Sequence, residues 1–160
     1  MKTTITAAAL VCAAVIVSAQ PGAPTDVPAR ARAAKRVVVG RILDVQAQFQ
    51  TNQFGDQLIV SNVLLEVSET LKGAAVPLLR LAVEGGTVGD LTLKVSDLPA
   101  MHTGDRAVFF LDDDGRGMHV PHDRGRGVLK LTAADSVEGT TLTLDRVRQQ
   151  VRSGLGQEAR

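Results

Sequence analysis

The stretch that decides the fold is GDRAVFFLDDDG, residues 104–115. Its centre, residues 107–111, is an apolar run in which no polar residue alternates with the apolar ones. Because successive residues of a strand point to opposite faces, both faces of a strand formed by this run would be apolar. Such a run predicts a central strand that is covered on both sides. Phe109 and Phe110 in this run are two of only four aromatic residues in the chain. We therefore expect the strand to lie between two apolar layers.

The polar residues 112–115 that follow predict a solvated hairpin tip, because Asp and Gly favour turns. Calcium binding by Asp112, Asp113 and Asp114 is the alternative. Arg116 stands where the spacing of a calcium loop requires a ligand, so the turn is favoured.

Period-two alternation on both sides of this segment predicts further strands. In residues 36–48 the apolar face is interrupted by Arg41, and Gly40 indicates a bulge or a close strand crossing. Two short strands are expected at residues 118–120 and 128–131. The inward-facing residues are predicted to be Val37, Val39, Leu43 and Val45 in the first strand, Ile59, Val63, Leu65, Val67 and Leu71 in the second, Leu79, Leu81 and Val83 in the third, and Leu91, Leu93 and Val95 in the fourth.

The end of the chain has the periodicity of a short amphipathic helix. Leu144, Val147 and Val151 share one stripe, with Thr143 as the predicted N-cap and Gly154 as the predicted stop. The sequence therefore predicts a mainly all-β fold: a small closed or partly open OB-like β-barrel of about six or seven strands with one C-terminal helix.

The first residues have the pattern of a secretory signal peptide. Lys2 precedes an apolar run that is too short to span a membrane, and small residues precede a cleavage site after Ala19. We expect a mature chain that is secreted or periplasmic and has no stable membrane anchor. The predicted parts are the signal peptide at 1–19, a flexible Pro/Ala/Arg linker at 20–34, the barrel at 35–133, and a C-terminal hairpin and helix extension at 134–160.

The composition argues against several classes of ligand. Of 18 basic side chains Lys2 is lost with the leader, which leaves 17 against 17 acidic ones and no net attraction to nucleic acid or an anionic membrane. Trp and Tyr are absent, so most of the stacking surface for single-stranded nucleic acid or sugars is missing. Cys12, the only cysteine, lies in the leader, so neither disulfides nor thiolate metal sites are expected. No cofactor is predicted.

Two sets of side chains have residue types that carry chemistry. His102, His119 and His122 are all the histidines, and three histidines can hold zinc. Ser96, Asp97 and His102 are the types found in a hydrolytic triad, but no G-x-S-x-G elbow frames the serine. We predict no catalytic residue, and the three-histidine metal site stays an alternative.

The loop EGGTVGD is the predicted binding loop. Gly85, Gly86, Gly89 and Asp90 could bind a ligand through backbone amides. Glycine is also the default residue for unusual backbone angles, so a conformational role in a tight connection is the competing interpretation and the favoured one.

Four motifs, taken in order, resemble a family of uncharacterised secreted bacterial proteins over residues 35–131. The resemblance implies export and a β-barrel fold, and it implies no activity because none is assigned to that family. The motifs are V-x-G-x-I from Val38 to Ile42, Leu71-Lys72-Gly73, Gly85-Gly86-x-x-Gly89, and Gly104-Asp105 followed by Phe109-Phe110-Leu111.

The chain is also distantly similar to the netrin-like barrel of the tissue inhibitors of metalloproteinases. In that OB-type fold a strand that ends in L-K-G also precedes a loop. Those inhibitors chelate the zinc of the protease through an N-terminal cysteine, whereas the predicted mature chain begins Gln20-Pro21 and has no cysteine. The similarity therefore extends to the barrel and not to the inhibitory mechanism.

These observations favour an exported, non-enzymatic β-barrel that acts as a binding module. Its expected partner is another exported protein, with a protease among the candidates, and its oligomeric state stays open. A metal-dependent hydrolase or metal-binding protein using the three histidines is one alternative. A structural envelope protein that associates with itself is the other.

Overall fold

The computed structural model describes residues 26–52, 54–115 and 117–156, so the predicted leader and the first part of the predicted linker lie outside the described residues. The elements are α1 (Val27–Ala33), β1 (Arg36–Thr51), β2 (Gln57–Lys72), β3 (Leu78–Glu84), β4 (Gly86–Val88), β5 (Leu91–Leu93), β6 (Arg106–Asp113), β7 (His119–Pro121), the 3₁₀ turn η1 (Arg124–Gly127), β8 (Val128–Leu131) and α2 (Leu144–Gly156).

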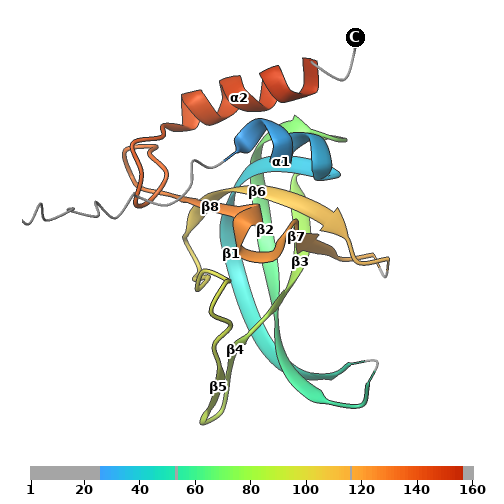
Figure 1. The fold of residues 1–160 in the computed structure, drawn as a ribbon. Coiled ribbons are helices and arrows are strands. Elements are labelled where there is room, and N and C mark those ends of the chain that lie inside the picture. The colour runs from blue at the N-terminus through green and yellow to red at the C-terminus, as the bar shows by residue number, and fades with distance from the viewer. Residues whose placement is uncertain (1–25, 53, 116, 157–160) are drawn as a thin grey trace, which may run out of the picture.

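Five strands close into a ring in the order β1, β2, β3, β7, β6 and back to β1 (Figure 1). Neighbours in this ring are antiparallel except β3 and β7, which run parallel and pair only at Leu81 and His119. β8 pairs with β6 on the edge that β1 leaves free. The ring is closed only weakly between β3 and β7, where a single residue pair joins the two strands. This arrangement confirms the expected mainly β fold, an OB-like and partly open barrel.

β6 lies between two apolar layers, as its sequence predicts. Val108 and Phe110 face a layer that includes α1 and α2. Ala107, Phe109 and Leu111 face the interior of the barrel. All five are at most 1% exposed. Burial of one large apolar side chain contributes about 1.5–3 kcal/mol to the free energy of folding. Because β6 buries such side chains on both faces, it stabilises both layers.

Gly40 lies at a bulge and at a close strand crossing, which confirms both predictions for it. The pairing of β1 with β2 shifts register between Val39 and Gly40. A Cβ atom on Gly40 would lie 2.7 Å from the carbonyl oxygen of Glu66 and 2.8 Å from a methyl carbon of Leu65. The absence of a side chain therefore lets β1 pass this close to β2.

Leu43 was predicted to point inward, but it is 40% exposed, so this prediction is wrong. The third register shift of this pairing lies between Ile42 and Asp44, and it leaves Leu43 without a partner on β2. The extra residue brings Val45 to the same side as Ile42, where both contact the barrel interior. A bulge of this kind breaks the period-two pattern from which the prediction was made.

The other predicted strands are present, with one correction. The expected inward residues Ile59, Val63, Leu65, Leu79, Leu81 and Val83 are buried. The fourth strand is only β5, which pairs with β4 in a separate hairpin instead of joining the ring. Leu91 of β5 is 62% exposed, so its predicted inward position is wrong.

The flexible linker predicted for residues 20–34 is wrong from Asp26 onward, where α1 begins. Asp26 caps this helix by accepting a hydrogen bond from the backbone N–H of Ala29 at 2.9 Å. Val27, Ala31 and Ala34 are fully buried against the helix-side layer, which also contains Val37 and Val39 of β1. The Lys72 amine donates to three carbonyl oxygens at the end of α1, those of Ala31, Arg32 and Ala34.

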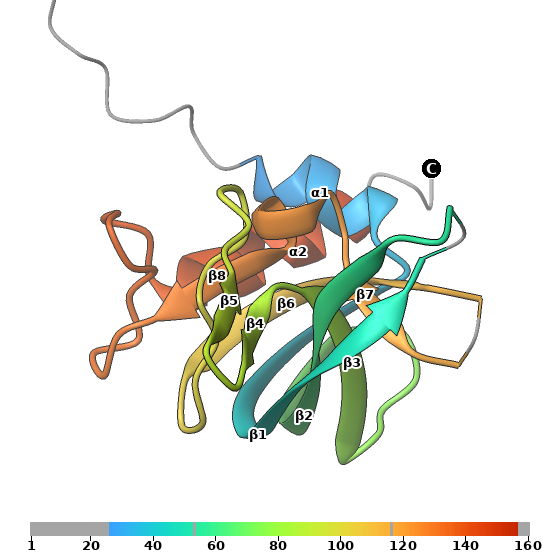
Figure 2. The same ribbon diagram turned by 90° about the horizontal axis from the view of Figure 1, so that it is seen from below.

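The C-terminal helix α2 is confirmed, with Leu144, Val147 and Val151 buried. The hydroxyl of Thr143 accepts a hydrogen bond from Arg146 N–H at 3.3 Å, as an N-cap residue does. The predicted stop at Gly154 is wrong, because the helix continues through Gly156. Both views place α2 beside α1 (Figures 1 and 2). Neither helix in the described part of the chain is long and apolar enough to cross a membrane.

Candidate functional site

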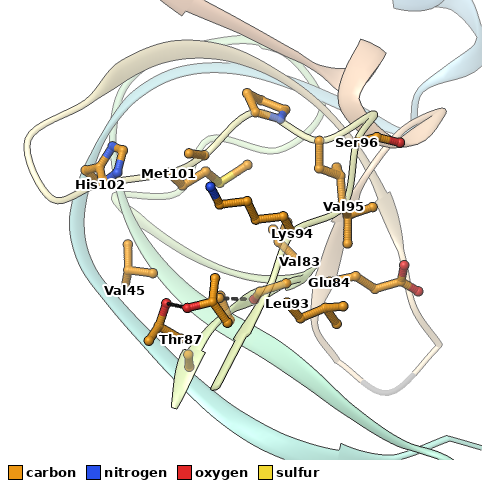
Figure 3. Close-up of a pocket in the computed structure, with 18 residues that line it drawn as sticks. Val45, Val83, Glu84, Thr87, Leu93, Lys94, Val95, Ser96, Met101 and His102 are labelled. Atoms are coloured by element: carbon orange, nitrogen blue, oxygen red, sulfur yellow. Dashed lines mark hydrogen bonds between the residues drawn. The ribbon is translucent and has the colours of Figure 1, made fainter. Parts of the chain in front are cut away.

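One end of the barrel holds a pocket of about 630 Å³, which we call the end pocket (Figure 3). The β4–β5 hairpin and the segment that follows it, residues 94–102, form one side, and β1, β2 and β3 form the other. Aliphatic side chains supply most of the wall. The main ones are Val45, Val83, Leu93, Val95, Leu98 and Met101.

Two of the four predicted binding-loop residues line the end pocket, and their role there is conformational. Gly85 and Gly86 have φ values of 101° and 133°, which favour glycine. A Cβ atom on Gly86 would lie 2.5 Å from the hydroxyl oxygen of Ser61 and 2.8 Å from the Cβ of Ala47. The buried Ser61 hydroxyl donates to the carbonyl oxygen of Gly85 at 2.7 Å. These contacts fix the hairpin against β1 and β2.

Gly89 and Asp90 lie apart from that pair, in the exposed turn between β4 and β5, and neither lines the end pocket. Gly89 has a φ of 58°, which the tight turn requires. The structure therefore divides the predicted loop into a pocket-lining part and an exposed tip.

The charged groups around the end pocket differ in whether they have a partner. Glu84 is the carboxylate of the lining, and it pairs with Arg124 at 3.2 Å. Arg124 also pairs with Asp97 at 2.6 Å. The hydrogen bond from Arg124 lowers the pKa of Asp97, and the hydrogen bond to Asp97 raises the pKa of Arg124. Lys94 also lines the pocket, and its side chain is exposed.

The three histidines each contact a different aspartate. The Nδ1 atoms of His119 and His122 lie 2.9 Å from Asp113 and 2.7 Å from Asp112, respectively. The Nδ1 atom of His102 lies 3.4 Å from Asp105, which is His102's neighbour in the loop before β6.

These pairs do not assemble into the three-histidine metal site. His102 precedes β6 and the other two histidines flank its far end, and an eight-residue strand spans about 26 Å. Within residues 26–52, 54–115 and 117–156 no group of three or more His, Cys, Asp and Glu side chains is arranged to hold a metal ion.

The candidate triad is likewise not assembled. Asp97 is bound to Arg124 and not to His102, whose Nδ1 atom contacts Asp105. Ser96 and His102 both line the end pocket, but Figure 3 shows them at opposite sides of it, and no hydrogen bond joins them among the described residues.

The Asp-rich turn is more than a solvated tip, which corrects the sequence interpretation. Asp112 accepts a hydrogen bond from the backbone N–H of Lys35, and Asp113 accepts one from the Lys35 amine at 3.3 Å. With the two histidine contacts, these bonds connect β6, β7 and the segment that follows α1. Only Asp114 acts as the turn residue, accepting from Met118 N–H at 3.0 Å.

Replacing Lys35 by methionine should make the protein more sensitive to acid. The hydrogen bond from the Lys35 amine, with a smaller contribution from His119, holds the pKa of Asp113 below its ordinary value of 3.8. A lowered carboxyl pKa stabilises the fold above pH 3.8, and this stabilisation is lost as the pH falls below that value. Acid unfolding followed by circular dichroism should therefore begin at higher pH in Lys35→Met.

Arg41→Met is the matched control for this prediction, because it removes one exposed positive charge from β1 beside Arg106, at the opposite end of β6 from Asp113. An NMR titration should show the Asp113 pKa rising toward 3.8 in Lys35→Met and unchanged in Arg41→Met. Equal shifts in both variants would mean that overall charge, and not the Lys35 contact, sets the acid sensitivity.

The β1–β2 hairpin exposes large apolar side chains that the sequence analysis did not single out. Phe54, at its tip, is 80% exposed, and Phe49 is 46% exposed. Asn52 organises the tip: its side-chain oxygen accepts hydrogen bonds from Phe54 N–H and Asp56 N–H, each at 2.9 Å. The signal in the sequence was a phenylalanine inside the turn-like TNQFGDQ, in a chain where aromatic residues are rare.

No family model matches this sequence, and no curated protein matches it.

Proposed function

We propose that the protein is an exported binding module, without catalytic chemistry of its own, that acts by binding another exported protein. The observation that carries the proposal is Phe54, 80% exposed at the tip of the β1–β2 hairpin. Aromatic side chains are enriched in protein interfaces, and an exposed one on a soluble domain is a frequent anchor.

The shape of the hairpin supports this role. Figure 1 shows β1 and β2 extending beyond the ring, with the β4–β5 hairpin projecting from the same end. Leu91 near the tip of that second hairpin is 62% exposed. In OB-type barrels the loop between the first two strands is one of those that bind ligands. We call Phe49, Phe54 and Leu91 the hairpin surface.

The hydrogen bonds of Asn52 add a second argument. They fix the turn that carries Phe54 before any partner arrives, so binding loses less conformational entropy than it would with a flexible loop. The partner that suits this geometry is an exported protein with an apolar pocket for one phenyl ring. Exported proteases are the first class to test, because the sequence has the distant similarity to the netrin-like barrel of protease inhibitors described above.

Phe54→Ser should weaken partner binding by about thirtyfold or more, the loss expected when a central aromatic anchor is removed. The measurement is crosslinked capture with tagged residues 20–160 from the exported fraction, followed by titration of the captured protein. Leu78→Ser is the matched control, since Leu78 is also exposed but lies at the start of β3, outside the hairpin surface.

Both variants should keep the melting temperature of the parent protein, because neither side chain is part of the core. A partner that binds Phe54→Ser as tightly as the parent would remove the hairpin surface from the proposal. A folded parent protein that captures no protein at all would refute the binding-module function itself.

A further inference from the structure

We propose that the end pocket binds an aliphatic carboxylate of medium chain length. Its volume of about 630 Å³ lies within the range of small-molecule sites, which are mostly apolar with a few placed polar groups. This inference does not depend on the hairpin surface or on a protein partner.

The apolar wall determines what the body of the ligand must be. Val45 and Val83 come from the ring, whereas Leu93, Val95 and Met101 come from the hairpin and the segment after it. All five are aliphatic or thioether side chains, and none of the chain's aromatic residues lines the pocket. A flexible alkyl chain fills such a wall by apolar burial, while the exposed imidazole of His102 is the one ring in the lining on which a planar ligand could stack.

Lys94 determines the charge of the ligand. Each of the other three lysines in the described residues has a partner: Lys35 pairs with Asp113, Lys72 binds the end of α1, and Lys130 pairs with Asp105. Lys94 has no hydrogen bond or ion pair among the described residues. Figure 3 shows its side chain reaching across the pocket toward Met101.

The carboxylate of the lining does not cancel that charge. Glu84 pairs with Arg124 at 3.2 Å, and in Figure 3 its side chain points away from the Lys94 amine. The pocket therefore has one unpaired cation, and an anionic group is its electrostatic complement. Lys94 is exposed, so the head of the ligand would lie at the open side and its tail against the aliphatic wall.

Hydroxyl groups near the same wall add hydrogen-bonding capacity for a carboxylate. The hydroxyls of Thr87 and Thr92 lie 2.9 Å from each other across the β4–β5 hairpin, and both residues line the pocket. One hydroxyl of such a pair can donate to the other and leave a second donor position for a ligand by rotation.

Two hydrogen bonds position the wall of the end pocket. The Ser61 hydroxyl fixes the hairpin through the carbonyl oxygen of Gly85. The Lys130 amine donates to the carbonyl oxygen of Ala100 at 3.1 Å, which holds the segment after β5 on the same side of the pocket. A preformed site of this kind binds its ligand with little ordering cost.

The test is isothermal titration calorimetry of tagged residues 20–160 with four probes below their micelle concentrations: decanoate, 1-decanol, decylammonium and acetate. We expect decanoate to bind at least about tenfold tighter than decanol, because hydrogen bonds to charged groups are stronger than neutral ones. Decylammonium should bind more weakly than decanol, and acetate should not bind measurably because it lacks the alkyl tail.

Lys94→Met keeps an apolar side chain of similar length and removes the charge. It should weaken decanoate binding at least about tenfold and leave decanol binding unchanged. Arg80→Met removes one positive charge from β3 outside the pocket and should bind decanoate like the parent protein. Circular dichroism of both variants confirms that they are folded.

Three results would overturn the proposal. The first is that decanoate binds no tighter than decanol, which would show that the pocket does not select a carboxylate. The second is that Lys94→Met binds decanoate as tightly as the parent protein does, which would show that Lys94 does not bind the carboxylate. The third is that the folded parent protein binds none of the alkyl probes, which would show that the end pocket is not a binding site for alkyl chains. None of these bears on the Phe54→Ser experiment, so the two proposals fail separately.

Discussion

Phe110→Ala should lower the free energy of unfolding by about 3–5 kcal/mol, the range measured when a buried phenylalanine is truncated to alanine. The Phe110 ring is fully buried in the layer beneath α1 and α2. The guanidinium carbon of Arg30 on α1 lies 5.4 Å from the centre of that ring, a cation–π contact that is lost with it. Chemical denaturation followed by circular dichroism measures the loss.

Phe109→Ala is the matched comparison for that variant. Its ring is equally buried but faces the barrel interior, so a loss of the same size is expected from the opposite layer. Hydrogen exchange should separate the two variants: Phe110→Ala should lose protection first in α1 and α2, and Phe109→Ala in the ring strands. Indistinguishable exchange patterns would show that β6 does not divide the core into two layers.

Gly154→Ala should destabilise the protein by about 1–3 kcal/mol, although alanine is the better helix former. A Cβ atom at this position would lie 2.7 Å from the carbonyl oxygen of Pro28 and 3.0 Å from its Cα. These neighbours are backbone atoms of α1, and they cannot move aside as the end of a flexible side chain does. The substitution must therefore push α1 and α2 apart.

Gly156→Ala provides the control in the same helix. A Cβ atom on Gly156 would meet nothing within 4 Å, so that variant should be neutral or gain up to about 1 kcal/mol. The melting temperature should fall in Gly154→Ala and stay the same or rise in Gly156→Ala. If Gly154→Ala is as stable as Gly156→Ala, then the two helices are not in the close contact that the structure has.

The sequence predicted those parts of the fold in which periodicity is strong and uninterrupted. β6 was identified by five consecutive apolar residues at 107–111, and α2 by three apolar residues at helical spacing. α1 was missed because its only buried residues are Val27 and Ala31, in a segment whose prolines and arginines suggest a linker. Its stability comes from α2 and Lys72, which lie far away in the chain.

The end pocket could not be predicted for a related reason. Its wall combines residues of the ring with those of a hairpin that leaves the sheet, and no local pattern links Val45 to Val95. Lys94 has an ordinary position beside an apolar residue in the sequence. It becomes distinctive only when the partners of Lys35, Lys72 and Lys130 are known. The loop glycines, in contrast, were identified from composition because a tight turn demands them.

The contact between α1 and α2 also sets the order in which the molecule can assemble. α1 is synthesised first among the described elements and α2 last, so the contact between them cannot form until almost the whole described chain has been synthesised. A contact between segments this distant in sequence closes a long loop, which costs chain entropy and slows folding. Until then α1 alone covers the apolar side of β1 and β6, which includes Val39 and Phe110. This layer is completed last, so it is the one that a chaperone of the unfolded chain has to protect longest.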